Sequence, residues 1–280
     1  MTPVSVITGG AGGMGLATAK IIGREHTVVL CDVRQDRLAD AATTLDGFGI
    51  TCKAVNCDVT DRHAVDGLIE TATGLGTVVS VVHAAGVSPS MGTAGYVMRT
   101  NAIGTVNVNE GFFPIAGEGS AIVNVASMAA HMLPESMVPT GQFQQALQDE
   151  DAFMKEMMTA CNVYPDEGRS GMAYAISKNF VRWYCTSQSE RFGSKGVRIV
   201  SVSPGSIDTE MGRLEAESGA GAMVADAAVP RWGEPEEMAE LLAFCAGDKA
   251  GYLTGTDILS DGGVVASMTE RARQAMGRDA

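Results

Sequence analysis

A tyrosine and a lysine four positions apart are the residues in this chain whose types and spacing most directly suggest chemistry. They are Tyr174 and Lys178, in the run Tyr-Ala-Ile-Ser-Lys. On a helix this spacing puts both side chains on one face. A phenol is a weak acid with an ordinary pKa near about 10, and a neighbouring ammonium favours its ionised form. The pair therefore predicts proton transfer to or from a substrate oxygen, with Tyr174 as the acid or base.

A glycine-rich run lies near the start of the chain, directly behind a short apolar segment. It reads Thr-Gly-Gly-Ala-Gly-Gly-Met-Gly over positions 8–15, after an expected strand at 4–8 and at the start of an expected helix at 15–24. Glycine permits a tight turn that phosphate can approach closely, and the N–H groups at a helix start attract anions. A flexible turn without a ligand is the alternative. The context of strand and helix favours a site for the pyrophosphate of a dinucleotide, formed by Gly9, Gly12, Gly13, Met14 and Gly15.

The end of the second expected strand indicates which dinucleotide is bound. Asp32 closes that strand and Val33 follows it. A carboxylate at this place accepts hydrogen bonds from a ribose diol and repels a 2′-phosphate, which favours NAD over NADP. Asp32 could also cap the next helix. Arg24 and Arg34 lie outside the glycine-rich turn, so we expect no phosphate clamp there.

Apolar runs alternate with helical patterns along most of the chain, and this order predicts an α/β fold. Continuously apolar strands indicate a parallel sheet covered on both faces, and right-handed crossovers give a doubly wound, Rossmann-type domain. No linker divides residues 1–280, so we expect a single domain. The expected strands are 4–8, 27–32, 51–57, 78–83, 121–125, 197–202 and 257–259, and the expected helices are 15–24, 37–45, 61–73, 97–113, 174–192 and 236–246.

Two long segments interrupt the alternation of strands and helices. Residues 129–171 lie between the fifth strand and the Tyr/Lys helix, and residues 206–230 follow the sixth strand. Long ordered loops in a compact domain are usually functional, and both leave from the carboxyl edge of the sheet, where ligands bind. We therefore expect a helical, lid-like insertion at 129–171 and a substrate-binding loop at 206–230.

Composition excludes several other functions. The chain has 280 residues and a formal net charge of −13, which argues against nucleic acid and anionic membranes as partners. Its apolar runs are too short to span a bilayer, and we expect a cytoplasmic protein without a leader peptide. The six cysteines form no Cys-x-x-Cys motif, so we expect reduced thiols and no metal site.

The motifs together resemble the short-chain dehydrogenase/reductase family, over roughly residues 4–264. Each motif falls at the right element and in the right order. They are the run at 8–15, Asp58-Val59, Ala84-Ala85-Gly86, Asn101, Ser127, Tyr174 with Lys178, Pro204-Gly205 with Ile207 and Thr209, and Asp261-Gly262-Gly263.

The resemblance implies a seven-stranded parallel sheet and a catalytic tetrad of Tyr174, Lys178, Ser127 and Asn101. Ser127 would hold the substrate oxygen, Lys178 would also bind the nicotinamide ribose, and Asn101 would hold a water on a proton path. The resemblance also implies cofactor contacts from Asp58, Val59, Ala84, Ala85, Gly86, Pro204, Gly205, Ile207 and Thr209. Asp58 could equally cap the helix that follows it.

Several features depart from the usual family pattern. His83 stands where the family commonly has Asn, which puts a local hydrogen bond in doubt rather than the chemistry. Ser127 and Tyr174 are 47 positions apart, since 174 − 127 = 47, and the segment between Gly86 and Asn101 is short. These two spacings and the run at 231–239 are similar to the bacterial 3α-hydroxysteroid dehydrogenase/carbonyl reductase subgroup. There an insertion before the tyrosine changes how subunits associate.

The insertion also suggests a class of substrate. Apolar residues at helical spacing predict an amphipathic helix over 142–159. They are Phe143, Leu147, Met154, Met157 and Met158. With the methionine-containing loop at 211–223, it would cover a hydrophobic substrate such as a steroid or a bulky ketone. The helical spacing is equally compatible with an alternative, in which this apolar face packs on the core or on another subunit. The tail at 264–280 could cover a neighbour's site or be loose.

These observations favour an NAD(H)-dependent oxidoreductase that interconverts a secondary alcohol and a hydrophobic ketone. By the resemblance we expect a homo-oligomer, either a dimer or a tetramer. The rival enzyme is an NADPH-dependent carbonyl reductase, which would need a basic phosphate site near Asp32. The rival of another class is a non-catalytic NAD-binding sensor, which would have no need to keep the proton donor.

Overall fold

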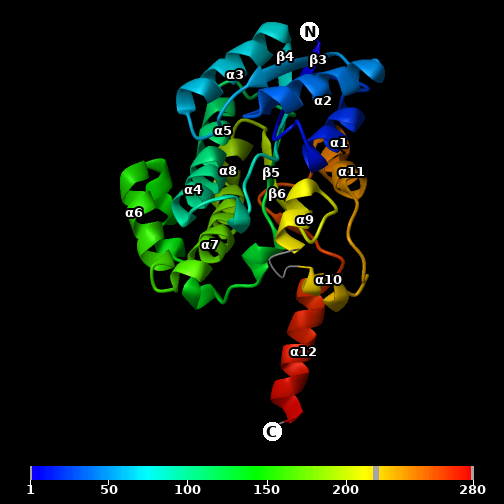
Figure 1. Ribbon diagram of the computed structural model, residues 1–280. Helices are drawn as coiled ribbons and strands as arrows, with labels where there is room; N and C mark the ends of the chain where they lie inside the picture. The colour runs from blue at the N-terminus through cyan, green and yellow to red at the C-terminus, as the bar shows by residue number, and fades with distance from the viewer. Residues whose placement is uncertain (1, 217–220, 279–280) are drawn as a thin grey trace.

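The computed structural model describes residues 2–216 and 221–278 and is built around one parallel sheet (Figure 1). The seven strands run in the order β3-β2-β1-β4-β5-β6-β7, and every neighbouring pair is parallel. The order reverses between β1 and β4, whose carboxyl ends therefore part to leave a crevice for ligands. The predicted doubly wound domain is confirmed. The strands are β1 Pro3–Thr8, β2 Thr27–Asp32, β3 Cys52–Asn56, β4 Thr77–His83, β5 Ala121–Val125, β6 Arg198–Pro204 and β7 Asp257–Ser260.

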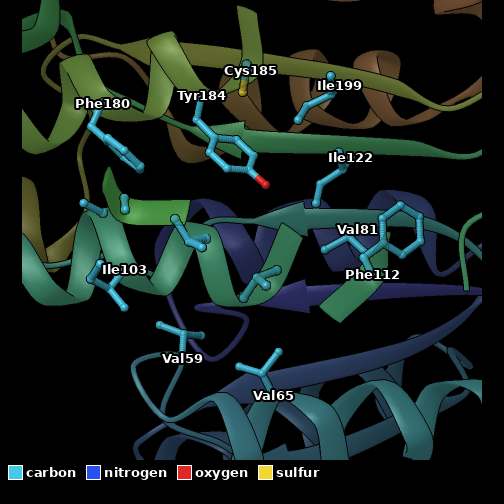
Figure 2. Packing of buried hydrophobic residues seen from close by; sticks show 14 of the residues in the cluster. Val59, Val65, Val81, Ile103, Phe112, Ile122, Phe180, Tyr184, Cys185 and Ile199 are labelled. Atoms are coloured by element: carbon cyan, nitrogen blue, oxygen red, sulfur yellow. The ribbon is translucent and has the colours of Figure 1, made fainter. Parts of the chain in front are cut away.

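Helices cover both faces of the sheet, and its central strands are therefore buried on both sides. On one face lie α1 (Gly13–Ile22), α2 (Gln35–Gly47) and α11 (Pro235–Ala246). On the other lie α3 (Arg62–Leu75), α5 (Gly104–Phe112) and α7 (Asp166–Ser187). Figure 2 shows the second face, where Phe112 of α5 and Tyr184 of α7 pack near Ile122 of the sheet. Both side chains are fully buried, so these helices hold fixed positions above the strands.

The helix expected at 97–113 begins earlier and contains a widened turn. It starts as α4 (Ala94–Met98), continues as the π-helical turn η2 (Arg99–Ile103), and ends as α5. The sequence pattern gives no sign of this turn. Such turns often occur at functional sites, and Asn101 lies within η2.

The insertion at 129–171 consists of short helical segments rather than one long helix. They are η3 (Met128–His131), η4 (Glu135–Met137), η5 (Thr140–Leu147) and α6 (Glu150–Cys161). The single helix predicted over 142–159 is wrong, because Asp149 starts a new helix by accepting a hydrogen bond from the Ala152 N–H at 3.0 Å.

The apolar side of the insertion packs on the catalytic helix. The Phe143 ring lies 5.3 Å from that of Phe180 in α7 and 5.6 Å from that of Trp183. Phe153 and Met157 of α6 are also fully buried in the same core. These residues therefore pack on the core of the domain, which is the alternative to a lid over the substrate.

The remaining segments lie mostly at the carboxyl edge of the sheet. The Tyr/Lys helix α7 begins at Asp166, eight residues before Tyr174, and α8 (Ser189–Gly193) follows it after a break. The helix α12 projects away from the sheet (Figure 1). None of the described helices combines the length and apolar character needed to cross a membrane. The other short elements are η1 (Pro89–Met91), α9 (Glu210–Glu215), α10 (Ala222–Asp226), η7 (Asp248–Ala250) and α12 (Val264–Arg278).

Candidate active site

The glycine-rich turn fits the backbone geometry that a pyrophosphate site requires. Gly9 and Gly13 have φ angles of +61° and +45°, which other residues rarely adopt. A Cβ added to Gly15 would lie only 2.3 Å from the Gly9 carbonyl oxygen. The N-cap of α1 is Gly12, which has no side chain to bond the first N–H groups of the helix. Those N–H groups and the positive end of the helix dipole are therefore suited to an anion beside Met14.

Two carboxylates lie at or just after the ends of the neighbouring strands β2 and β3, at the carboxyl edge of the sheet. Asp32 ends β2 and accepts hydrogen bonds from the N–H groups of Ala11 at 3.4 Å and Arg34 at 3.2 Å. It therefore lies against the glycine-rich turn, with Val33 next to it and exposed. Asp58 accepts from the Thr60 N–H and hydroxyl, both at 2.8 Å.

The N-cap of α3 is Asp61 and not Asp58, the residue that the sequence suggested. Asp61 accepts a hydrogen bond from the His63 N–H at 2.9 Å and so begins the helix. The alternative role of Asp58 as the helix cap is therefore not what the structure shows. Val59 is buried and its carbonyl accepts from the Asn107 amide at 3.0 Å, which fixes the loop after β3.

Tyr174 and Lys178 lie on one face of α7, as their spacing predicts. The Lys178 Nζ lies 5.8 Å from the centre of the Tyr174 ring and donates a hydrogen bond to the Val125 carbonyl at 2.9 Å. Lys178 is buried, and burial lowers its pKa to about 8. A lysine whose pKa lies this close to neutral pH can release and regain a proton at physiological pH.

Ser127 lies two residues after the end of β5 and beside the tyrosine. Burial raises the pKa of the Tyr174 phenol, a hydrogen bond with the Ser127 side chain lowers it, and the charge of Glu215 raises it again. The Ser127 hydroxyl also accepts from the Ala129 N–H at 3.2 Å, which orients it at the start of η3. The two hydroxyls are thus placed to bind the same substrate oxygen.

Asn101 is held by the loop that follows β4. Its side-chain oxygen accepts from the Val87 N–H at 2.9 Å, and its amide donates to the Val87 carbonyl at 3.0 Å and the Ser177 hydroxyl at 3.2 Å. A Cβ added to Gly86 would lie 3.1 Å from the Asn101 oxygen and 3.3 Å from the Lys178 Nζ. These two atoms therefore flank one small space, which only glycine at position 86 leaves open.

The loop after β4 is tied to the glycine-rich turn through His83 and Thr8. The Thr8 hydroxyl accepts from the Ala85 N–H at 3.2 Å and pairs with the His83 Nδ1 at 2.7 Å. The Ala84 N–H donates to the Thr8 carbonyl at 3.2 Å. Burial and the charge of Lys178 lower the pKa of His83 to about 3, so this imidazole is neutral. His83 thus makes a structural hydrogen bond at the place where the sequence left one in doubt.

The loop after β6 folds back over the glycine-rich turn. Pro204 ends β6, and a Cβ on Gly205 would lie 2.6 Å from the Asp261 Cα, so the loop needs glycine there. Ile207 is buried and pairs with the backbone of Gly233.

Thr209 lies at the start of α9 and against the glycine-rich turn. Its hydroxyl caps α9 by accepting from the Gly212 N–H at 3.0 Å. Its methyl group lies 2.9 Å from a Cβ built on Gly13. A cavity of about 560 Å³ opens between α9 and the turn, lined by Gly13, Asp208, Thr209, Glu210, Arg213 and Leu214.

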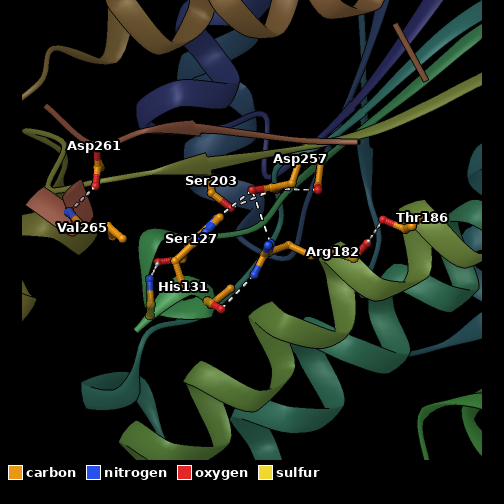
Figure 3. A network of polar contacts seen from close by, with 11 residues as sticks. Ser127, His131, Arg182, Thr186, Ser203, Asp257, Asp261 and Val265 are labelled. Carbon is orange, nitrogen blue, oxygen red and sulfur yellow. Dashed lines mark hydrogen bonds and ion pairs between the residues drawn. The ribbon is translucent and has the colours of Figure 1, made fainter. Parts of the chain in front are cut away.

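A buried polar cluster positions the segment that carries Ser127. His131, in the turn after Ser127, bonds through Nε2 to a carboxylate oxygen of Asp257 in β7 at 2.8 Å. Arg182 of α7 lies 3.4 Å from the same oxygen and donates to the Ala130 carbonyl at 2.9 Å. Figure 3 shows these contacts around Ser127, with Ser203 donating to Asp257 at 2.9 Å. No sequence pattern indicates this cluster, because His131 and Asp257 lie 126 positions apart.

Arg37 also lies at the site, and the sequence analysis did not single it out. Its guanidinium lies 3.8 Å from a Cβ built on Gly12, and it pairs with Glu210 of α9. The spacing of Arg37 from Asp32 is the only signal in the sequence that could have drawn attention to it. A cation therefore stands beside the glycine-rich turn, already bound to a carboxylate.

Comparison with known proteins identifies the family. A model described as short chain dehydrogenase matches residues 3–139, and one described as enoyl-(acyl carrier protein) reductase matches residues 156–265. The chain is 32% identical over 277 residues to the short-chain dehydrogenase/reductase bsc3 of Alternaria brassicicola, covering 96% of this chain and 98% of the relative. The fold and these matches define a nicotinamide-dependent oxidoreductase. The chain belongs to the short-chain dehydrogenase/reductase family.

Two further proteins are similar to this chain, one in sequence and one in fold. The chain is 28% identical over 275 residues to the 3-alpha-hydroxysteroid dehydrogenase/carbonyl reductase of Comamonas testosteroni, covering 95% and 97% of the two chains. A short chain dehydrogenase from Burkholderia cenocepacia, solved in complex with NADP, has a similar fold. Its TM-score is 0.74 at 22% identity, over 93% of this chain and 96% of that one.

Proposed function

We propose that this chain is an NAD(H)-dependent oxidoreductase that interconverts a secondary alcohol and a ketone, with Tyr174 as the acid and base. The observation that carries the proposal is the arrangement of Tyr174, Ser127, Lys178 and Asn101 at the carboxyl edge of the sheet. The nicotinamide supplies or accepts the hydride when the cofactor is bound. A protein that only senses the cofactor does not need a phenol and a hydroxyl that are placed to bind the same substrate oxygen.

The proton steps follow from the placement of these side chains. In reduction, Tyr174 donates its proton to the carbonyl oxygen while Ser127 hydrogen-bonds the same oxygen. Lys178 then supports the phenolate, since a nearby ammonium stabilises the ionised tyrosine. Because the pKa of Lys178 is lowered to about 8 by burial, it can pass a proton onward. The space flanked by Lys178 and Asn101 next to Gly86 is suited to a water on that path.

Asp32 supports NAD as the cofactor. Its carboxylate lies against the glycine-rich turn, where it would bind a ribose diol and repel a 2′-phosphate. Arg37 supports the alternative, an NADPH-dependent carbonyl reductase, because it brings a guanidinium to the same turn. Arg37 is already paired with Glu210, and this pairing favours NAD.

Cofactor titration tests this choice. NADH and NADPH are added separately to the wild-type protein and to Asp32→Ala, and binding is followed by nicotinamide fluorescence. We expect NADH to bind more tightly than NADPH to the wild type, and Asp32→Ala to lose this preference. Asp36→Ala removes an exposed carboxylate from α2 and is the matched control. A wild-type preference for NADPH would refute the assignment of NAD.

A hydrophobic alcohol or ketone is the proposed substrate. Leu214 of α9 is 42% exposed, so it can contact an apolar ligand. The name of the Comamonas relative points in the same direction. The insertion contributes less directly, since Phe143 and Phe153 are buried against α7.

We also propose a homo-oligomer. Phe244 of α11 is 46% exposed and Tyr252 is fully exposed, and another copy of the chain could bury these side chains. Light scattering of the purified protein would measure the assembly directly, and a monomer would refute it.

A further inference from the structure

The short helix α9 (Figure 1, yellow) has a carboxylate near each end, and the two contact different parts of the chain. Glu210 at its start pairs with Arg37 of α2, beside the glycine-rich turn. Glu215 at its end accepts hydrogen bonds from the Ser90 hydroxyl and from the Ser90 N–H, the latter at 3.3 Å. Ser90 follows Gly86, whose loop flanks Lys178 and Asn101. The Glu215 end of α9 therefore lies at the substrate end of the site.

Among the described residues, no cation pairs with the carboxylate of Glu215. Arg213, two residues earlier, is paired with Asp208 at 2.7 Å, and Arg37 is paired with Glu210. Within residues 2–216 and 221–278, the contacts of Glu215 are to Ser90, a neutral residue, and include no ion pair. Glu215 is half-buried, so water screens its charge only in part.

Glu215 is also within electrostatic reach of the catalytic hydroxyl. Besides burial and the hydrogen bond from Ser127, its charge is the remaining influence on the pKa of Tyr174. A substituent that extends from the oxygen bound by Tyr174 and Ser127 towards the end of α9 would therefore approach this carboxylate.

We propose that Glu215 is a specificity-determining residue that selects uncharged ketones and alcohols and rejects those that carry a carboxylate. This inference rests on the proposed function and narrows its substrate class. Proteins often obtain specificity by building repulsion against the wrong ligand as well as attraction for the right one. A carboxylate without an ion pair among the described residues supplies such a repulsion, while Leu214 next to it is exposed and can contact an apolar substrate.

Two ketones that differ by one carboxylate group test the proposal. Acetophenone and 3-acetylbenzoate share a ring and a carbonyl, and the second carries a carboxylate. kcat/KM is measured for both with the preferred cofactor in wild type, Glu215→Gln and Glu240→Gln. The last variant removes an exposed carboxylate from α11 and is the charge-matched control.

We expect the wild type to prefer acetophenone by at least about tenfold, because like charges about 5 Å apart at a partly screened site repel by several RT. Glu215→Gln should raise kcat/KM for 3-acetylbenzoate about tenfold and change that for acetophenone by less than about threefold. Glu240→Gln should leave the ratio at the wild-type value. Added salt should raise wild-type activity on the anion, and should do so less in Glu215→Gln.

Two results would overturn the inference, and they can be told apart. Turnover of acetophenone with the same discrimination against the anion in Glu215→Gln would refute the role of Glu215 and leave the proposed function standing. No turnover of either ketone by any of the three proteins, with either cofactor, would count against the proposed function itself and would remove the basis of this inference.

Discussion

Replacing Lys178 with methionine is expected to make the protein more stable at neutral pH while it abolishes turnover. The ammonium is buried, and its hydrogen bond is to the Val125 carbonyl at 2.9 Å. Burial lowers the pKa of Lys178 from 10.5 to about 8. A folded pKa below the unfolded pKa means that folding disfavours the charged form. The resulting decrease in the free energy of unfolding is at its full size below about pH 8 and disappears as the pH rises towards about 10.5.

The size of the effect follows from these values. The difference between 10.5 and about 8 corresponds to a cost of about 3 kcal/mol at neutral pH, at about 1.4 kcal/mol per pH unit. Methionine has no charge to bury but leaves the Val125 carbonyl without its donor, which costs about 1 kcal/mol. We therefore expect Lys178→Met to raise the free energy of unfolding by about 2 kcal/mol at about pH 7.

Urea unfolding of the cofactor-free proteins measures this gain. The advantage of Lys178→Met should be present at about pH 7 and should vanish by about pH 10, where the wild-type lysine is neutral in the folded state. Lys53→Met replaces an exposed lysine of β3 and should show no such pH dependence. A variant that is no more stable at neutral pH, or whose advantage is the same at both pH values, would refute the reasoning.

Two further predictions test the packing and the cofactor site. Phe143→Ala should lower the free energy of unfolding by about 3–5 kcal/mol in urea, because it empties a fully buried site between the insertion and α7, whereas Phe48→Ala at an exposed position should not. Gly15→Ala should abolish binding of both dinucleotides in a fluorescence titration, because its Cβ would lie 2.3 Å from a backbone oxygen of the turn. Gly47→Ala, with nothing within 4 Å of its Cβ, should bind them normally.

Much of the fold could be predicted from the sequence because its signals are local. The apolar strands lie in continuous runs, and the glycines at the first turn are demanded by backbone geometry at Gly9, Gly13 and Gly15. Tyr174 and Lys178 are neighbours on a helix because of their spacing alone. Each of these features depends on residues close together in the chain.

The features that could not be predicted depend on contacts between distant residues or on a single backbone irregularity. Helical periodicity continues across position 149, so the pattern did not reveal that Asp149 ends one segment and starts another. The π-helical turn at Asn101 has no signature in residue type. The pairing of Arg37 with Glu210 joins positions 173 apart, and only the fold brings them together.

The central claim is that Tyr174 transfers the proton, and Tyr174→Phe tests it most directly. The hydroxyl is removed while the ring stays in place, so cofactor binding should be kept. With a neutral ketone that the wild type reduces, we expect kcat to fall by about 10²–10⁴-fold, the usual contribution of a positioned acid. NADH titration of the same sample shows whether the site is intact. A variant that binds NADH normally and keeps kcat within about fivefold of the wild type would contradict the account.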